Sequence, residues 1–286
     1  MGNRSWTRLG MAAVAISASA WTNAPALAAT LVNTELVLSV DASSSVSSGE
    51  FALQQQGYVN AFRDAEVIDI IESLDDGIAV TLQYWSTNTA AALPWYHITD
   101  AASANTFADA VAATINPGGG VTNIAAAINS ATNLLLTNDF EGARKVIDVS
   151  GDGTQNANVG GTAPCSATGY YINNVEAACT NLVQAARNNA AANEIIINGL
   201  PILTDVSTLD DYYQNYVITG EDAFIQPATT FGDFGEAVKL KIKREILPDP
   251  EPDPASVPEP SIVLGLLIAG GLGTTMGRRN PTQPKS

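Results

Sequence analysis

Short apolar segments alternate with longer helical segments from residue 33 to residue 246, and this alternation leaves few possible folds. Strand-forming residues fill 36–40, 78–85, 91–98, 145–149, 194–198 and 224–225. Helical patterns occupy 47–63, 101–115, 123–137, 175–188, 209–216 and 231–246. Strands joined through a helix run parallel, so the pattern predicts a doubly wound α/β domain. We expect a mostly parallel sheet flanked by helices, with one antiparallel edge strand.

The composition is that of a folded, acidic protein. The 286 residues are 46% hydrophobic and 15% charged, which is enough apolar material for a buried core. Lys and Arg number 13 against 29 Asp and Glu, and the net charge of -16 would repel a phosphate backbone. Nucleic acid is therefore not an expected partner.

Cysteine and histidine are scarce. Two cysteines and one histidine are too few for a Cys/His zinc site or an iron–sulfur cluster. Any metal must be held mainly by oxygen atoms, which favours Mg²⁺, Ca²⁺ or Mn²⁺.

The first 28 residues have the organisation of a secretory signal. Arg4 and Arg8 precede an apolar stretch at 9–20, and Ala26-Leu27-Ala28 matches the small residues before a signal-peptidase cut. A buried N-terminal helix is the alternative, but the sequence 21–25, which ends in Pro25, would break it. We expect an exported protein whose mature chain begins near residue 29.

Prolines and acids mark the end of the domain. Residues 248–256 begin Pro-Asp-Pro-Glu-Pro-Asp-Pro, which favours an extended spacer and excludes a helix. The sequence therefore predicts one domain over residues 29–247, followed by the spacer.

The residues after the spacer resemble a sorting signal. Val-Pro-Glu-Pro at 257–260 is followed by an apolar helix at 262–276 and two arginines at 278–279. Fifteen residues reach only ~23 Å, short of the ~30 Å hydrocarbon layer. Residues 257–279 resemble the PEP-CTERM tail of Gram-negative bacteria, which implies transient membrane insertion, processing by a transpeptidase-like enzyme, and release or re-anchoring at the cell surface. The polar tail 280–286 is longer than is usual. The alternative, a helix packed on the domain, is disfavoured by the spacer.

Three loops supply oxygen ligands to one edge of the predicted sheet. Asp41, Ser43 and Ser45 follow the first strand, and their i, i+2, i+4 spacing gives them a common face. Thr122 follows three glycines, and Asp152 follows the strand at 145–149. If these strands are neighbours, the five side chains converge. Hydroxyl and carboxylate oxygens are what a hard divalent cation binds.

This pattern resembles the von Willebrand factor A (vWA) domain, a Rossmann-like fold, and its metal-ion-dependent adhesion site (MIDAS). That motif reads Asp-x-Ser-x-Ser, then a distant Thr and a distant Asp, and the five residues match it in order. Segments 35–41, 51–58, 146–153 and 197–202 resemble, more narrowly, a bacterial family of secreted vWA-like proteins of unknown function.

The resemblance implies roles for the five residues. Ser43, Ser45 and Thr122 would bind Mg²⁺ directly, and Asp41 and Asp152 would act through water and hydrogen bonds. Such an ion stays electrophilic and takes a carboxylate from a partner. Alone, an Asp-x-Ser-x-Ser sequence is also a common helix cap or linker.

Other acids have simpler interpretations. Asp148 lies inside a strand and is expected to be a buried, hydrogen-bonded residue. The pairs Asp75-Asp76 and Asp210-Asp211 are expected to be solvated turn or helix-start acids.

Patterns typical of enzymes are weak or missing from the sequence. It contains neither Gly-x4-Gly-Lys-Ser/Thr nor Gly-x-Ser-x-Gly. A Ser-His-Asp triad would need His97, which lies in a predicted edge strand. A phosphotransferase that uses Asp41 would place a second acid where Ser43 stands. We expect a non-enzyme, with a metal-dependent hydrolase as the less favoured reading.

The two cysteines lie close together in the chain. In an exported protein, Cys165 and Cys179 most simply form a disulfide that stiffens the Gly/Asn-rich loop, and free buried thiols are the alternative. Tyr170-Tyr171 in that loop could face a partner or pack beneath the loop.

Together these patterns predict a secreted, cell-surface binding protein. Its partner would be a protein or acidic polymer that offers a carboxylate to the cation. The alternative is a structural surface or matrix protein whose ion only stabilises the fold.

Overall fold

A computed structural model describes residues 2, 28–158 and 177–247. The chain divides into two compact units, Met1–Ile246 and Leu247–Ser286. The predicted secretory signal, sorting tail and Tyr170-Tyr171 pair lie outside the described residues. Within the described ranges no helix is both long enough and apolar enough to span a membrane.

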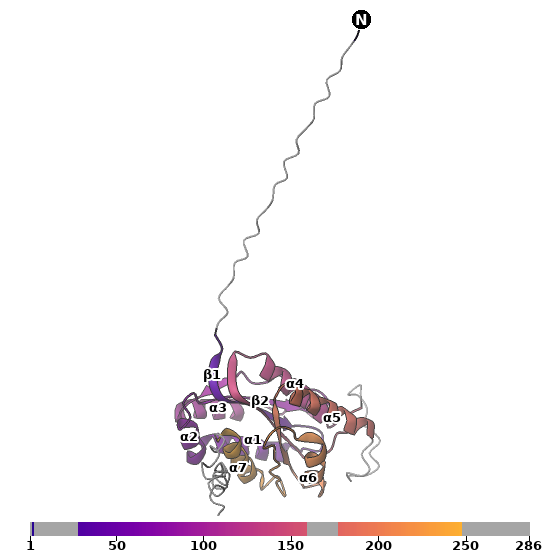
Figure 1. The fold of residues 1–286 in the computed structure, drawn as a ribbon. Coiled ribbons are helices and arrows are strands. Elements are labelled where there is room, and N and C mark those ends of the chain that lie inside the picture. The colour runs from indigo at the N-terminus through magenta and orange to yellow at the C-terminus, as the bar shows by residue number, and fades with distance from the viewer. Residues whose placement is uncertain (1, 3–27, 159–176, 248–286) are drawn as a thin grey trace, which may run out of the picture. The chain divides into compact units, whose positions relative to one another are not determined.

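A five-stranded sheet forms the centre of the domain (Figure 1). Its order is β3-β2-β1-β4-β5. β1 pairs in parallel with β2 and β4, β4 pairs in parallel with β5, and only β3 is antiparallel, at the edge. The bounds are β1 Thr30–Asp41, β2 Ile78–Trp85, β3 Tyr96–Ile98, β4 Phe140–Gly151 and β5 Ile196–Pro201. This confirms the predicted fold class, including the antiparallel edge strand.

Helices cover both faces of the sheet and divide the core into two (Figure 1). One core lies under α1 Ser48–Arg63, α2 Ala65–Glu72, α3 Ala101–Ala112 and α7 Phe234–Ile246. The other lies under α4 Ile124–Leu136, α5 Ala177–Ala192, α6 Leu209–Tyr212 and a π-helical turn, η2, at Tyr213–Val217. β1 is buried on both faces, as the centre of a parallel sheet must be.

Capping side chains fix the helix starts. Ser47 and Glu50 form a capping box at the start of α1, and Asp100 and Asn123 cap α3 and α4. Asp64 caps α2, a helix that the sequence analysis missed. The missed signal was Asp64 followed by the buried, one-turn-spaced Val67 and Ile71.

Strand bounds differ from the predictions for local reasons. The expected strand at 91–98 is regular only over Tyr96–Ile98, since Pro94 has no N–H to donate. β5 begins two residues late because Glu194 takes a left-handed φ of 59°. Residues 224–225 form no full strand, and Ile225 makes an isolated bridge with Gly199.

Candidate metal centre

The loop after β1 turns sharply around Asp41. Asp41 is the last residue of β1 and is fully buried. Its Oδ1 accepts a hydrogen bond of 2.7 Å from the Ser43 N–H, which folds the loop back over the strand end. The Ser43 Oγ then lies 3.2 Å from the Ser45 Oγ. Three of the predicted ligands thus lie within one turn.

The loop after β4 meets this turn because β1 and β4 are neighbours. Val40 pairs with Ser150, so both strands end at the same edge. The Ser45 hydroxyl donates to Asp152 Oδ1 at 2.7 Å. Two segments more than a hundred residues apart in the chain are therefore in direct contact.

The glycine loop before Thr122 completes the cluster. Ser44 N–H donates to the Gly120 carbonyl at 3.0 Å, and Gly120 N–H donates to Ser44 Oγ at 2.8 Å. A Cβ on Gly119 would lie 2.5 Å from that same oxygen, so this close approach requires glycine. The Thr122 hydroxyl then donates to Ser43 Oγ at 3.3 Å.

All five predicted residues thus form one connected cluster at one edge of the sheet. Ser43, Thr122, Asp41 and Asp152 are buried, and Ser45 is exposed. The set offers three hydroxyls and two carboxylates, all hard oxygen donors. Within residues 28–158 and 177–247, this cluster included, no group of three or more His, Cys, Asp or Glu side chains could hold a metal ion, so a cation here would depend on the hydroxyls as well as the two carboxylates.

The two carboxyl groups of the cluster are electrostatically strained. Burial, and then repulsion from Asp152, raise the pKa of Asp41 to about 8. Burial also raises the pKa of Asp152, against the hydrogen bond from Ser45, and the charges of Asp205 and Glu50 raise it further. Among the described residues, the buried Asp41 Oδ2 has no hydrogen-bond partner. A divalent cation would offset this repulsion, so the residues present fit such an ion.

Residues that the sequence analysis did not select hold the cluster in place. The Gln54 amide donates to the Asp41 carbonyl at 3.2 Å. Asn156 exchanges two hydrogen bonds with the Thr122 backbone, at 2.7 and 3.0 Å. Gln155 bridges the backbone N–H of Ala125 and the side chain of Asn123. These are common polar residues, and no sequence pattern marks them.

Outside the cluster, Asp148 is buried as predicted, but it forms an ion pair and not a hydrogen bond. Its partner is Lys241, at 2.8 Å. The two acid pairs are surface groups: Asp75, Asp76 and Asp211 are exposed and Asp210 is half-buried.

His97 is exposed on β3. Its Nε2 lies 2.8 Å from the Asp76 carbonyl oxygen, and its ring packs edge-on against Phe140. None of these contacts is to a serine or to an aspartate side chain.

Cys179 is buried in α5, with its Sγ 3.5 Å from the Ala157 carbonyl. Cys165 lies outside the described residues, so the pairing of the two cysteines stays a prediction.

A family described as "Protein of unknown function (DUF1194)" matches residues 31–250. The chain belongs to the DUF1194 family. Among curated proteins, none matches the sequence.

Solved structures show what this DUF1194 domain resembles. The pilus adhesin SpaC from Lactobacillus rhamnosus GG has TM-score 0.52 and 15% identity, covering 75% of this chain and 30% of that one. The PilB minor pilin from Streptococcus sanguinis has TM-score 0.51 and 15% identity, covering 78% and 64%. These two likenesses show the fold alone, a vWA-like domain.

Proximal thread matrix protein 1 from the mussel byssus, in a structure with a zinc-occupied MIDAS motif, has TM-score 0.49 and 13% identity, covering 73% of this chain and 46% of that one. The DUF1194 chain spans less than two thirds of each of these three relatives.

Proposed function

We propose that this protein is an exported, surface-destined binding protein that attaches to a partner through a divalent cation. The cation, most simply Mg²⁺, would be held by Asp41, Ser43, Ser45, Thr122 and Asp152. The partner would be a protein or acidic polymer that supplies a carboxylate. Export rests on the signal-like residues 1–28, and surface sorting rests on the PEP-CTERM-like tail.

One observation carries the proposal: two carboxyls and three hydroxyls from three separate loops meet at the end of β1. The carboxyls repel each other, and Asp41 Oδ2 is buried without a hydrogen-bond partner among the described residues. Burying polar oxygens in this way costs stability unless a ligand compensates for it. A cation bound there would offset this cost.

The ligand types favour attachment over catalysis. Ser43, Ser45 and Thr122 would contact the ion with neutral oxygens, and the acids would hold it mainly through water and hydrogen bonds. An ion with few anionic ligands remains strongly electrophilic, so a carboxylate from outside binds it well. Ser45 is exposed, which leaves the ion reachable from solvent.

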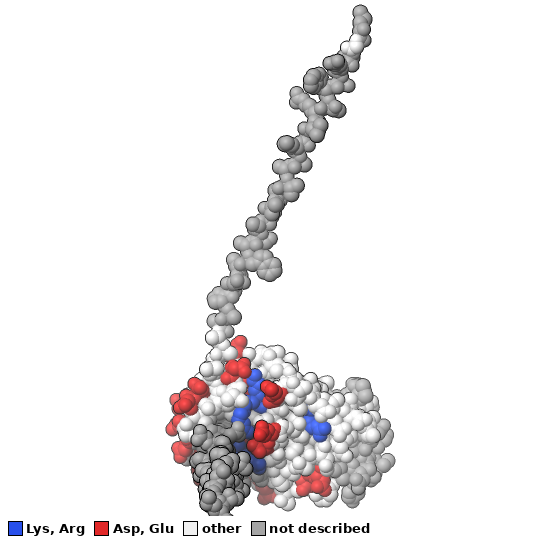
Figure 2. Space-filling view, viewed as in Figure 1, with Lys and Arg blue, Asp and Glu red and all other residues white. Residues whose placement is uncertain are grey.

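The charge distribution is compatible with a cation-mediated contact and not with nucleic acid. On the face shown in Figure 2, most basic side chains lie among acidic ones. Arg63 pairs with Asp109, Lys145 with Glu141, and Lys243 with Glu66. Because basic groups are paired in this way, an acidic partner would depend on the ion for attraction.

The second candidate is a structural surface or matrix protein in which the ion only stabilises the fold. The buried position of Ser43, Thr122 and Asp152 favours it, since an ion there would link three loops. Hydrolysis is the least favoured reading, because the contacts of His97 are to Asp76 and Phe140, so the base would have to be one of the two acids that hold the ion.

A chelator experiment separates these functions. Cell-surface extracts are passed over the immobilised protein with Mg²⁺ or with EDTA, and the unfolding temperature is measured in both buffers. We expect Mg²⁺-dependent capture, lost in EDTA and in Ser43→Ala, from a chain that stays folded. Capture that is indifferent to EDTA would contradict the proposal. Unfolding in EDTA at the temperature of the assay would instead favour the structural role.

The enzymatic reading has its own test. Turnover of a generic esterase or phosphatase substrate that is lost in Asp41→Asn or His97→Ala would support a hydrolase.

A further inference from the structure

Tyr213 packs against β5 and β4, and its hydroxyl lies near Asp41 of the candidate metal centre. It is the first residue of the π-helical turn η2 and is fully buried. A Cβ on Gly199 of β5 would lie 2.7 Å from the Tyr213 ring, and a Cβ on Gly151 of β4 would lie 2.9 Å from its hydroxyl. The ring therefore packs over two glycines in neighbouring strands, where any side chain would collide with it.

The hydroxyl of Tyr213 ends beside the carboxylate of Asp41. The same Cβ position on Gly151 lies 2.8 Å from Asp41 Oδ2. Both oxygens are thus within 2.9 Å of one point. The register explains this proximity: Val40 pairs with Ser150, so Asp41 and Gly151 follow at the next position of adjacent strands.

These two oxygens are chemically complementary. Within the described part of the chain, neither Asp41 Oδ2 nor the Tyr213 hydroxyl has a hydrogen-bond partner, although both are buried. A carboxylate oxygen accepts hydrogen bonds and a phenol donates one, so each can satisfy the other.

We propose that Tyr213 is a positioning residue of the metal centre, whose hydroxyl donates to Asp41 Oδ2, directly or through one water, when the cation is bound. This rests on the proposed function. The Ser43 N–H holds Oδ1, and Tyr213 holds Oδ2, so both ends of the carboxylate are fixed. Outer hydrogen bonds of this kind orient the groups around a metal and tune its affinity. Gly151 leaves the space beside both oxygens free of a side chain, and Gly199 leaves room for the Tyr213 ring.

Calorimetric titration of the metal-free full chain with Mg²⁺ tests this proposal. We expect Tyr213→Phe, which keeps the ring and removes only the hydroxyl, to bind Mg²⁺ about 10-fold more weakly than wild type. Its unfolding temperature in EDTA should match or exceed that of wild type, because a buried hydroxyl without a partner is removed.

The matched control is Tyr58→Phe. Tyr58 is equally buried, and its hydroxyl lies 3.2 Å from the Ser150 Oγ of the same strand β4. This variant should lose stability in EDTA and keep its Mg²⁺ affinity within about 2-fold.

Two outcomes would overturn the assignment of Tyr213. One is Tyr213→Phe with wild-type affinity. The other is Gly151→Ala, folded, with wild-type affinity, since its methyl group would separate the two oxygens. Asp41→Ala distinguishes failure of this inference from failure of the proposed function. If wild type binds and Asp41→Ala does not, only the role of Tyr213 is at stake; if they bind equally, or neither binds, both proposals fall.

Discussion

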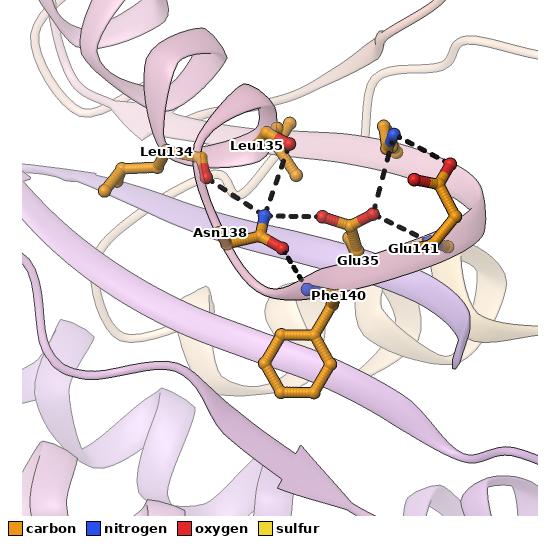
Figure 3. A network of polar contacts seen from close by, with 8 residues as sticks. Glu35, Leu134, Leu135, Asn138, Phe140 and Glu141 are labelled. Atoms are coloured by element: carbon orange, nitrogen blue, oxygen red, sulfur yellow. Dashed lines mark hydrogen bonds and ion pairs between the residues drawn. The ribbon is translucent and has the colours of Figure 1, made fainter. Parts of the chain in front are cut away.

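β1 carries two buried carboxylates, Glu35 in its middle and Asp41 at its end, and the chain surrounds them differently. In the middle of the strand, Glu35 is fully buried and surrounded by donors (Figure 3). Its Oε2 accepts from the Asn138 amide at 2.6 Å, its Oε1 accepts from the Gly142 N–H at 2.7 Å, and Lys145 lies 3.8 Å away. At the far end, Asp41 Oδ1 is bonded and Oδ2 is not, and Asp152 adds a repulsive charge.

The difference separates an acid that serves the fold from one that serves a site. Glu35 ties β1 to the loop before β4 with donors from the chain itself, and needs nothing more. Asp41 is equally buried, but its compensation is incomplete within the described residues. Since burial without compensation costs stability, the end of β1 is where the chain is suited to receive a ligand from outside.

The largest predicted effect concerns another group of buried acids, whose positive partner is a lysine of the chain itself. Lys241 of α7 pairs with Asp148 at 2.8 Å and also with Glu245, and all three are fully buried. We expect Lys241→Met to lower the free energy of unfolding by about 3–5 kcal/mol, with or without Mg²⁺, because it leaves two buried acids uncompensated. Urea denaturation measures this.

The control for that change is Lys243→Met, two residues along α7, which removes a partly exposed pair with Glu66. It should cost less than about 1 kcal/mol. Equal losses in the two variants would show that the buried ion pairs of Lys241 stabilise the fold no more than the exposed pair of Lys243.

The next effect tests Glu35, the β1 carboxylate whose two oxygens both accept hydrogen bonds. Glu35→Ala leaves the Gly142 N–H without its acceptor and removes one of three acceptors of the Asn138 amide, so we expect a loss of about 2–3 kcal/mol that Mg²⁺ does not change. Glu141→Ala, which removes only the exposed partner of Lys145, should cost less than about 1 kcal/mol. A Glu35→Ala protein as stable as wild type in urea would refute the claim that the hydrogen bonds of Glu35 stabilise the fold.

The pH dependence of stability reports the acid cluster around Lys241. Burial raises the pKa of Glu245 to about 7 from its ordinary 4.5, while Lys241 opposes the shift and Asp148 adds to it. Between these values the folded chain binds more protons than the unfolded chain, so stability falls as pH rises from 4.5 to 7. We expect Glu245→Gln to remove about 3 kcal/mol of this fall, as measured by urea denaturation across the window.

If the free energy of unfolding of wild type and of Glu245→Gln changed equally with pH, Glu245 would not be the titrating group.

The smallest effect sharpens the contrast at Asp41. In EDTA, Asp41→Asn should be within about 1 kcal/mol of wild type, or more stable, because the pKa of Asp41, raised to about 8, already leaves most of this carboxyl uncharged near neutral pH. In Mg²⁺ the wild type alone should gain stability. A large loss of unfolding free energy in EDTA, comparable to that of Glu35→Ala, would mean that Asp41 stabilises the fold without a metal ion.

The sequence predicted the parts of this arrangement that depend on local spacing. Alternating apolar segments gave the sheet, and the i, i+2, i+4 spacing after β1 gave Asp41, Ser43 and Ser45. Placing Thr122 and Asp152 beside them required only that their loops end at the same sheet edge. The family resemblance supplied the order of the five residues.

What the sequence could not predict depends on contacts between distant segments. Glu35 and Lys241 look like surface residues because their compensating partners lie in other elements. Tyr213 carries no motif, although Gly151 and Gly199 inside strands were a signal that a bulky group approaches closely. These contacts exist only once the strand order is known.

The central claim is that Asp41 and its four neighbours hold one divalent cation, and calorimetric titration of the metal-free chain with Mg²⁺ tests it most directly. We predict one ion per chain for wild type and for Glu141→Ala, and no measurable binding for Asp41→Ala. Equal Mg²⁺ affinity in wild type and Asp41→Ala would contradict the claim.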